Sequence, residues 1–178
     1  MTPEDAPDEA AGDGAPDSVG PEAPSTSSRV ADAVSIASDF GVVWIAVAVA
    51  QVLLRRATPL NAARRLGFAG VASLVLTRWL KHHFAVPRTE LDESASTLAR
   101  TPTSDRFPSG HTLAAFVAAL TIPTRPLGRA LAVTFATLVA WARVRVGHHR
   151  AVDVVAGAAV GILAGSALAA ALPSSSTA

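Results

Sequence analysis

Three short segments of the chain carry residue types that together could hold a phosphoryl group, attack its phosphorus and protonate the leaving oxygen. They are residues 81–88, 108–111 and 143–153. Their candidate site residues include three cations, two histidines and an aspartate, namely Lys81, Arg88, Arg143, His111, His149 and Asp153. Lys81 is the only lysine in the chain, whereas the other fourteen basic residues are arginine. A lone ammonium group in an otherwise arginine-only chain suggests a specific requirement at that position.

The segment 108–111 reads Pro-Ser-Gly-His and lies directly before an apolar stretch. We expect Ser109 to be the N-cap of a helix, with its side-chain oxygen bound to one of the first free backbone N–H groups. Such a helix start is a ready anion site, and Gly110 would let a phosphate approach the backbone closely. His111 is expected to face the same anion. The alternative is an ordinary capped helix with an incidental histidine.

His149 and Asp153 stand four residues apart, so they share one face at the start of a helix. An aspartate bound to one ring nitrogen fixes the tautomer and leaves the other nitrogen as a nucleophile. A structural pair that closes a helix end is the alternative. Arg143 precedes His149 by six residues, and its planar guanidinium could hold two phosphate oxygens.

Lys81 and Arg88 are predicted to complete the phosphate site from a third helix end. Their alternative role is to extend their charged groups to the membrane surface from an apolar helix. His82, His83 and His148 lie next to these segments. We interpret these three histidines as interfacial residues outside the site.

A metal site is the competing interpretation of the same residues. His111, His149 and Asp153 have suitable donor atoms for a divalent cation. However, the lysine and arginines that surround them would repel a cation. We therefore expect neither a metal ion nor any other cofactor.

Composition predicts a membrane protein. Half of the residues are hydrophobic and 16% are charged, compared with roughly 25% charged residues in soluble domains. The arginines of residues 40–178 interrupt long apolar runs instead of forming a basic stripe, which argues against a nucleic-acid partner. The chain has no cysteine, so disulfides and thiolate metal sites are excluded.

Five apolar segments indicate an all-α, polytopic transmembrane helix bundle of about five spans. A span needs about 20 residues for a hydrocarbon core of roughly 30 Å. The segments lie at about 34–54, 66–80, 111–122, 127–146 and 151–172, of which the second and third are short. With five spans, the three chemistry-bearing segments meet on one membrane face, because helix ends alternate between the two faces.

The sequence is divided into one domain and two tails. Residues 1–28 are rich in Pro, Ala, Ser and acids and are predicted to be a disordered acidic tail. Residues 29–173 form the transmembrane domain, and 174–178 a short C-terminal tail. The acidic start shows no basic and apolar pattern of a cleaved signal peptide. Within the last apolar segment, Gly157, Gly161 and Gly165 form a small-residue face on which another helix can pack closely.

These motifs resemble those of the type 2 phosphatidic acid phosphatase superfamily, whose members share an active site with vanadium haloperoxidases. The family pattern is Lys, six residues, Arg-Pro; then Pro-Ser-Gly-His; then Ser-Arg, five residues, His, three residues, Asp. All three spacings hold here. Thr89 stands where the family has proline, and Ala142 stands where it has serine. The second replacement would remove a hydrogen bond that the serine donates to phosphate. Many relatives have six spans instead of five.

The resemblance implies a haloperoxidase-like helical core and a membrane lipid phosphatase that uses a phosphohistidine intermediate. It implies that His149 is the nucleophile, that Asp153 orients it and that His111 is the general acid. The expected phosphate-binding residues are Lys81, Arg88, Ser109, Gly110 and Arg143.

Polyprenyl diphosphate or a polyprenyl-phosphoribose phosphate is the favoured substrate, and the composition is typical of a high-GC bacterium. Phosphatidic acid and phosphatidylglycerophosphate are alternatives, as is an inactive carrier or scaffold that binds a lipid phosphate. Arginine-rich turns on the far face place the active site outside the cytoplasm by the positive-inside rule. The sequence does not determine the oligomeric state.

Overall fold

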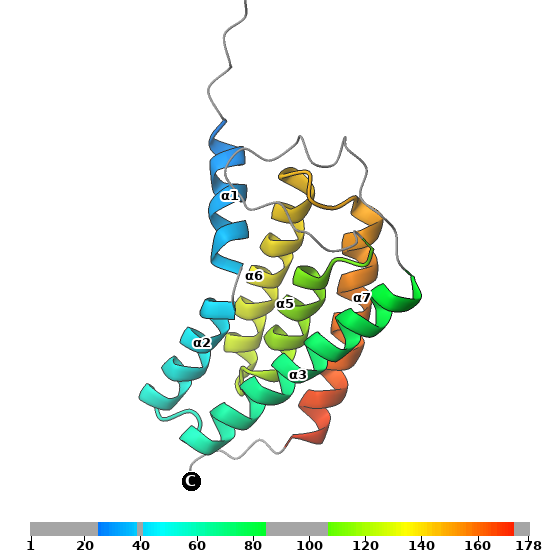
Figure 1. The fold of residues 1–178 in the computed structure, drawn as a ribbon. Helices are drawn as coiled ribbons and strands as arrows, with labels where there is room; N and C mark the ends of the chain where they lie inside the picture. Colours follow the sequence, from blue (N-terminus) through cyan, green and yellow to red (C-terminus); the bar gives the residue numbers. More distant parts are fainter. Residues whose placement is uncertain (1–24, 39–40, 85–106, 173–178) are drawn as a thin grey trace, which may run out of the picture.

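A computed structural model describes residues 25–38, 41–84 and 107–172, and all the regular secondary structure within these ranges is helical (Figure 1). The described residues form six helices: α1 (Thr26–Ser38), α2 (Val42–Leu53), α3 (Pro59–His83), α5 (Gly110–Thr121), α6 (Pro126–Arg145) and α7 (Ala151–Ala171). The predicted all-α class is therefore confirmed. Residues 1–24 of the predicted acidic tail and the tail at 174–178 lie outside the described ranges, whereas 26–28 already belong to α1.

The last three predicted segments agree with α5, α6 and α7 to within a few residues, but the first two differ. The first segment is two helices, α1 and α2, whose axes differ by 68°. Gly41 precedes α2 with a left-handed φ of 68°, a conformation that glycine adopts without steric cost.

The second segment is longer than its apolar pattern, because α3 begins at Pro59 rather than near residue 66. Thr58 caps this helix, since its side-chain oxygen accepts the Asn61 backbone N–H at 3.2 Å. Pro59 suits the first helical position, where no intrahelical N–H bond is lost.

Two helices, α6 and α7, are long and apolar enough to cross a membrane, and the bent pair of α1 and α2 would be a third if it forms one span. Among the described helices, α5 is apolar but has only 12 residues. The predicted count of about five spans is thus not confirmed by length and composition.

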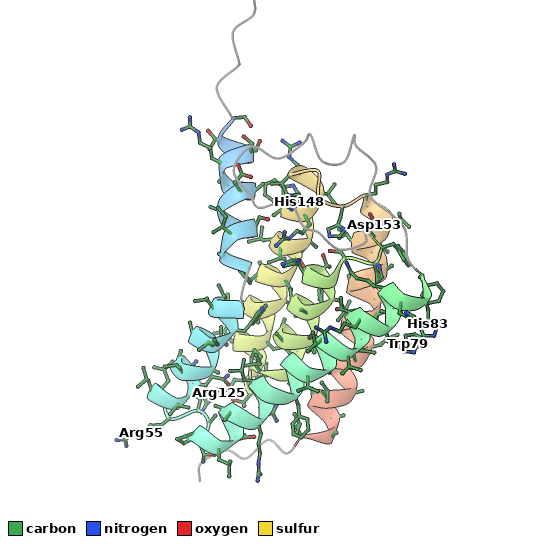
Figure 2. All side chains as sticks on the ribbon, viewed as in Figure 1. Arg55, Trp79, His83, Arg125, His148 and Asp153 are labelled. Carbon is green, nitrogen blue, oxygen red and sulfur yellow. The ribbon has the colours of Figure 1, made fainter. Side chains whose placement is uncertain are left out.

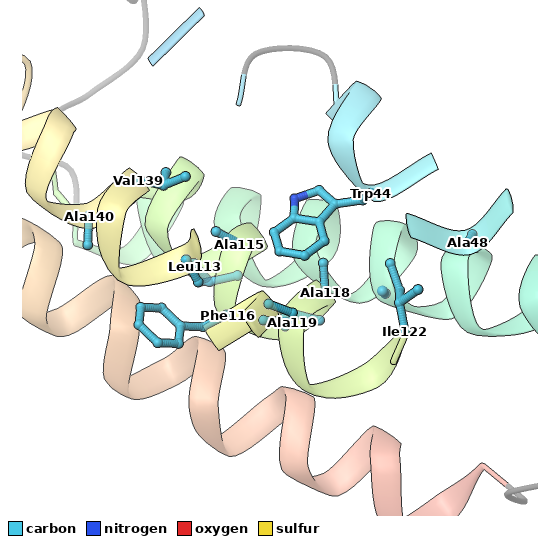
Figure 3. Packing of buried hydrophobic residues seen from close by; sticks show 14 of the residues in the cluster. Trp44, Ala48, Leu113, Ala115, Phe116, Ala118, Ala119, Ile122, Val139 and Ala140 are labelled. Atoms are coloured by element: carbon cyan, nitrogen blue, oxygen red, sulfur yellow. The ribbon is translucent and has the colours of Figure 1, made fainter. Parts of the chain in front are cut away.

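The centre of the bundle is α5, which packs against α3, α6 and α7 (Figures 1 and 3). Most of its side chains are buried, among them Leu113, Val117 and Ala119. Figure 3 shows Leu113, Phe116 and Ala119 of α5 in one cluster with Trp44 of α2 and with residues of α6. A short helix buried on nearly all sides therefore holds the longer helices together.

The predicted small-residue face of α7 is confirmed, and its partner is α5. A Cβ atom added at Gly157 would lie 2.5 Å from the carbonyl oxygen of Ser109, and one at Gly161 would lie 2.6 Å from that of Leu113. Gly165 continues the contact toward the end of α5. The two helices thus meet with backbone against backbone, which only glycine permits at these positions.

At the other end of this helix pair, Arg65 of α3 binds the last carbonyl groups of both helices. Its Nη1 donates to the Thr121 carbonyl at 2.7 Å and its Nη2 to the Leu172 carbonyl at 2.9 Å. Arg65 is 2% exposed. The sequence did not reveal this role, in which the side chain satisfies carbonyl groups left open at two helix ends.

Candidate active site

The end of α3, the start of α5, the end of α6 and the start of α7 lie at one end of the bundle (Figure 1). Two backbone hydrogen bonds join these segments. The Ser109 N–H donates to the Asp153 carbonyl at 2.9 Å, and the His149 N–H donates to the Arg143 carbonyl at 3.1 Å. The structure therefore brings the second and third motif segments into direct contact, as the alternation of helices predicted.

His149 and Asp153 are both buried at the start of α7. His149 Nδ1 lies 3.9 Å from Asp153 Oδ2, which is longer than a hydrogen bond. The same Oδ2 accepts the backbone N–H of Arg150 at 2.8 Å, so Asp153 also caps α7 from its N3 position. The predicted pair is adjacent, and the expected orienting bond requires Nδ1 and Oδ2 to approach by about 1 Å.

Ser109 is the N-cap residue of α5, as predicted, but its hydroxyl group makes no capping hydrogen bond. The fully buried hydroxyl instead lies 3.0 Å from the Thr112 hydroxyl. The prediction of a side-chain cap was wrong because a second hydroxyl one turn along the helix competes for the serine. The first N–H groups of α5 still open toward this end of the bundle, with His111 half-buried beside them.

Gly110 has a packing role that the sequence did not reveal. A Cβ atom on Gly110 would lie 2.8 Å from Thr77 Cγ2, so glycine lets α5 begin directly against α3. Lys81, which is half-buried, follows Thr77 by one helical turn and lies in the last turn of α3. This contact places the end of α3 beside the start of α5. Arg88 and Thr89 lie outside the described residues.

Arg143 is 1% exposed and its guanidinium lies between two partners. Nη1 is 3.2 Å from His148 Nδ1, and Nη2 donates to the Ser35 backbone carbonyl at 3.3 Å. Ser35 belongs to α1, which packs along the end of α6. A backbone carbonyl leaves no signature in a sequence, so this contribution of α1 had no signal that could have found it.

His148 was predicted to be interfacial and outside the site, but its ring lies against Arg143. His148 is 1% exposed and, in Figure 2, lies at the same end of the bundle as Asp153. Its place next to His149 was the signal that could have suggested a role in the site. His82 and His83 are exposed, and the centroid of the His83 ring lies 4.4 Å from that of the Trp79 ring.

The charges at this end favour an anion. Arg143 and Lys81 are cations, and the N-terminus of α5 adds the positive end of a helix dipole. The described part of the chain contains two carboxylates, Asp153 and Asp32, the latter on α1 one turn before Ser35. Within that part, no group of three His, Cys, Asp or Glu side chains is arranged to hold a metal ion.

An apolar groove of about 470 Å³ reaches this end between α2, α3 and α5. On α3 its wall runs from Leu66 to Thr77, the residue that contacts Gly110. Eleven residues of helix correspond to about 16 Å. The groove therefore offers a path for a hydrocarbon chain that ends beside the anion-binding residues.

No solved structure matches the chain. Among curated proteins, undecaprenyl-diphosphatase BcrC of Bacillus subtilis (strain 168) is 33% identical over 101 residues, which is 56% of this chain and 52% of that protein. The chain thus matches about half the length of this relative. The profile of the PAP2 superfamily matches residues 62–175, more than half of the chain, and confirms the resemblance seen in the motifs. The chain belongs to the PAP2 superfamily.

Proposed function

We propose that the protein is a membrane-embedded lipid phosphatase that removes a phosphate from a polyprenyl diphosphate. The observation that carries this proposal is the meeting of the Ser109–Gly110 helix start with the Arg143–Asp153 segment beside an apolar groove. Anion-binding groups at the mouth of a hydrocarbon-sized groove suit a phosphate attached to a lipid. The name of the similar Bacillus subtilis protein, an undecaprenyl-diphosphatase, favours the diphosphate.

In the proposed reaction, His149 attacks the terminal phosphorus through its Nε2 atom. A P–N bond forms as the bond to the bridging oxygen breaks, and His111 donates a proton to that leaving oxygen. Water then attacks the phosphohistidine and loses a proton to the neutral His111. The P–N bond breaks, which releases phosphate and regenerates the histidine. Asp153 holds His149 in the tautomer that leaves Nε2 unprotonated.

Lys81, Arg88, Arg143 and the backbone of Ser109 and Gly110 stabilise the charge on the equatorial oxygens. Positioned cations and N–H donors are the main catalytic resource in phosphoryl transfer. The scheme needs no metal ion. Polyprenyl-phosphoribose phosphate, phosphatidic acid and phosphatidylglycerophosphate fit the same chemistry and are the competing substrates.

We place the active site on the extracytoplasmic face of a bacterial plasma membrane, in a bundle of about five spans. Arg56 and Arg125 are exposed in the turns at the opposite end, where the described residues carry no carboxylate. Because basic turns remain on the cytoplasmic side, the active site at the other end of the bundle would lie outside the cytoplasm.

The test is phosphate release by the detergent-purified protein in the presence of EDTA. The substrates are a polyprenyl diphosphate, a polyprenyl-phosphoribose phosphate, phosphatidic acid and phosphatidylglycerophosphate, and the variant is His149→Ala. Fastest release from the diphosphate that disappears in the variant supports the proposal, whereas loss of activity with EDTA contradicts the metal-free scheme. Binding of the lipids by a folded protein without phosphate release would instead favour the carrier or scaffold.

A further inference from the structure

A second groove, of about 250 Å³, lies between α2 and α6. Its walls are mainly apolar and include Trp44 and Phe135, whose rings meet edge to face at 5.7 Å. Arg56 and Arg125 also line it, from the two turns that precede α3 and α6. Figure 2 shows Arg125 at the end of the bundle away from His148 and Asp153. This groove is therefore separate from the candidate active site.

The two turns that supply the arginines are fixed to each other by a buried amide. Gln51 Nε2 donates to the Ile122 carbonyl at 3.0 Å, and Gln51 Oε1 accepts both the backbone N–H and the hydroxyl of Thr124, each at 3.0 Å. The Thr124 hydroxyl also lies 3.3 Å from the Arg56 carbonyl. The backbones that carry Arg56 and Arg125 are thus held on the same groove by a hydrogen-bonded network rather than by chance proximity.

The wall formed by α6 is open at Gly128. A Cβ atom at this position would meet only Pro123 Cβ, at 3.6 Å, which is an ordinary contact. A larger side chain at Gly128 would therefore project into the groove without a clash at its first atom. The lack of a side chain at Gly128 thus leaves room in the groove.

We propose that this groove binds an anionic membrane phospholipid, with an acyl chain along Trp44 and Phe135 and the phosphate between Arg56 and Arg125. Guanidinium groups bind phosphate oxygens in a bidentate way, and basic pockets between membrane helices bind anionic head groups. The described residues that line the groove include no carboxylate that would repel the phosphate. They also include no histidine or other nucleophile suited to phosphoryl transfer, so the site binds lipid without cleaving it.

The experiment measures binding of phosphatidylglycerol and of phosphatidylcholine with the same acyl chains to the detergent-purified full chain, by native mass spectrometry. We expect phosphatidylglycerol to bind more tightly than phosphatidylcholine. In the double variant Arg56→Gln/Arg125→Gln, its affinity should fall by roughly tenfold or more, since both guanidinium groups that attract the anionic head group are lost. Gly128→Leu, which keeps both charges, should weaken binding by filling the groove.

Two control variants match these changes. Arg64→Gln/Arg129→Gln removes two exposed arginines from α3 and α6 outside the groove, and Gly67→Leu adds the same side chain where nothing lies within 4 Å. Both should bind phosphatidylglycerol as the unaltered chain does. Equal binding of the two lipids, or unchanged binding by Arg56→Gln/Arg125→Gln, would overturn the proposal. So would a dimer in the unaltered chain that Gly128→Leu dissociates without any effect on lipid binding, because a second copy would then fill the groove.

Discussion

The backbone N–H of Ser109 donates to the backbone carbonyl of Asp153 at 2.9 Å, so the first residues of α5 and α7 are joined directly. This bond links the Pro-Ser-Gly-His segment to the segment that carries His149. Below it, Gly157 and Gly161 keep the two helix backbones in contact. The positions of the proposed acid and nucleophile are therefore set by main-chain atoms.

Gly161→Ala should destabilise the protein and lower its activity. The new Cβ atom would lie 2.6 Å from the Leu113 carbonyl, which is backbone and has little room to move. Overpacking of this kind costs about 1–3 kcal/mol. Thermal unfolding in detergent and phosphate release measure the two effects. Gly67→Ala, in open space on α3, should leave stability unchanged or slightly raised, and equal effects of the two variants would contradict the packing role.

Arg143→Ala should lower kcat/KM for the proposed reaction by about 10²–10³, the scale for losing one preorganised donor. Arg143→Lys should recover little of this loss, because an ammonium group cannot hold two oxygens in one plane. The exposed neighbour Arg145, on the same helix, provides the control as Arg145→Ala. Near-normal turnover in Arg143→Ala would rule out a role in phosphate binding.

His148→Ala should reduce kcat/KM by about tenfold, because it removes the ring nitrogen that lies 3.2 Å from Arg143 Nη1. His148→Asn should restore most of the rate, since its side-chain oxygen can accept a hydrogen bond in a similar place. Steady-state kinetics on both variants, with matched unfolding curves, separate positioning of Arg143 from simple loss of packing. A rate in His148→Asn as low as in His148→Ala would favour the packing explanation.

Arg65→Met should lower the unfolding temperature without changing the rate per folded molecule. The variant leaves the Thr121 and Leu172 carbonyls without this donor, at about 1–3 kcal/mol for each buried group. Arg65 lies at the far ends of α5 and α7, away from His149. Arg64→Met, an exposed neighbour, should have little effect on stability. A loss of activity in Arg65→Met at temperatures where the protein remains folded would show coupling to the site.

The sequence predicted which helix ends meet. The apolar runs of α5, α6 and α7 have clear limits, the motif segments lie at those limits, and successive helix ends alternate between the two ends of the bundle. The sequence did not predict the break before α2, since Gly41 also fits a continuous apolar helix. The hydrogen bonds of Arg65 and Arg143 to backbone carbonyl groups could not be predicted from the sequence either, because every residue carries such a carbonyl. The Ser109 hydroxyl could be assigned to a cap from its type, but its contact with Thr112 depends on side-chain geometry.

The contact between α1 and Arg143 affects how much of the chain is needed for function. Residues 62–175 match the family profile, whereas the Ser35 carbonyl that accepts from Arg143 lies well before that segment. A chain shortened to the family segment would retain every motif residue yet lose one of the acceptors that hold its buried arginine. We therefore expect the functional boundary of this protein to lie upstream of α1, although sequence similarity alone would place it near residue 62.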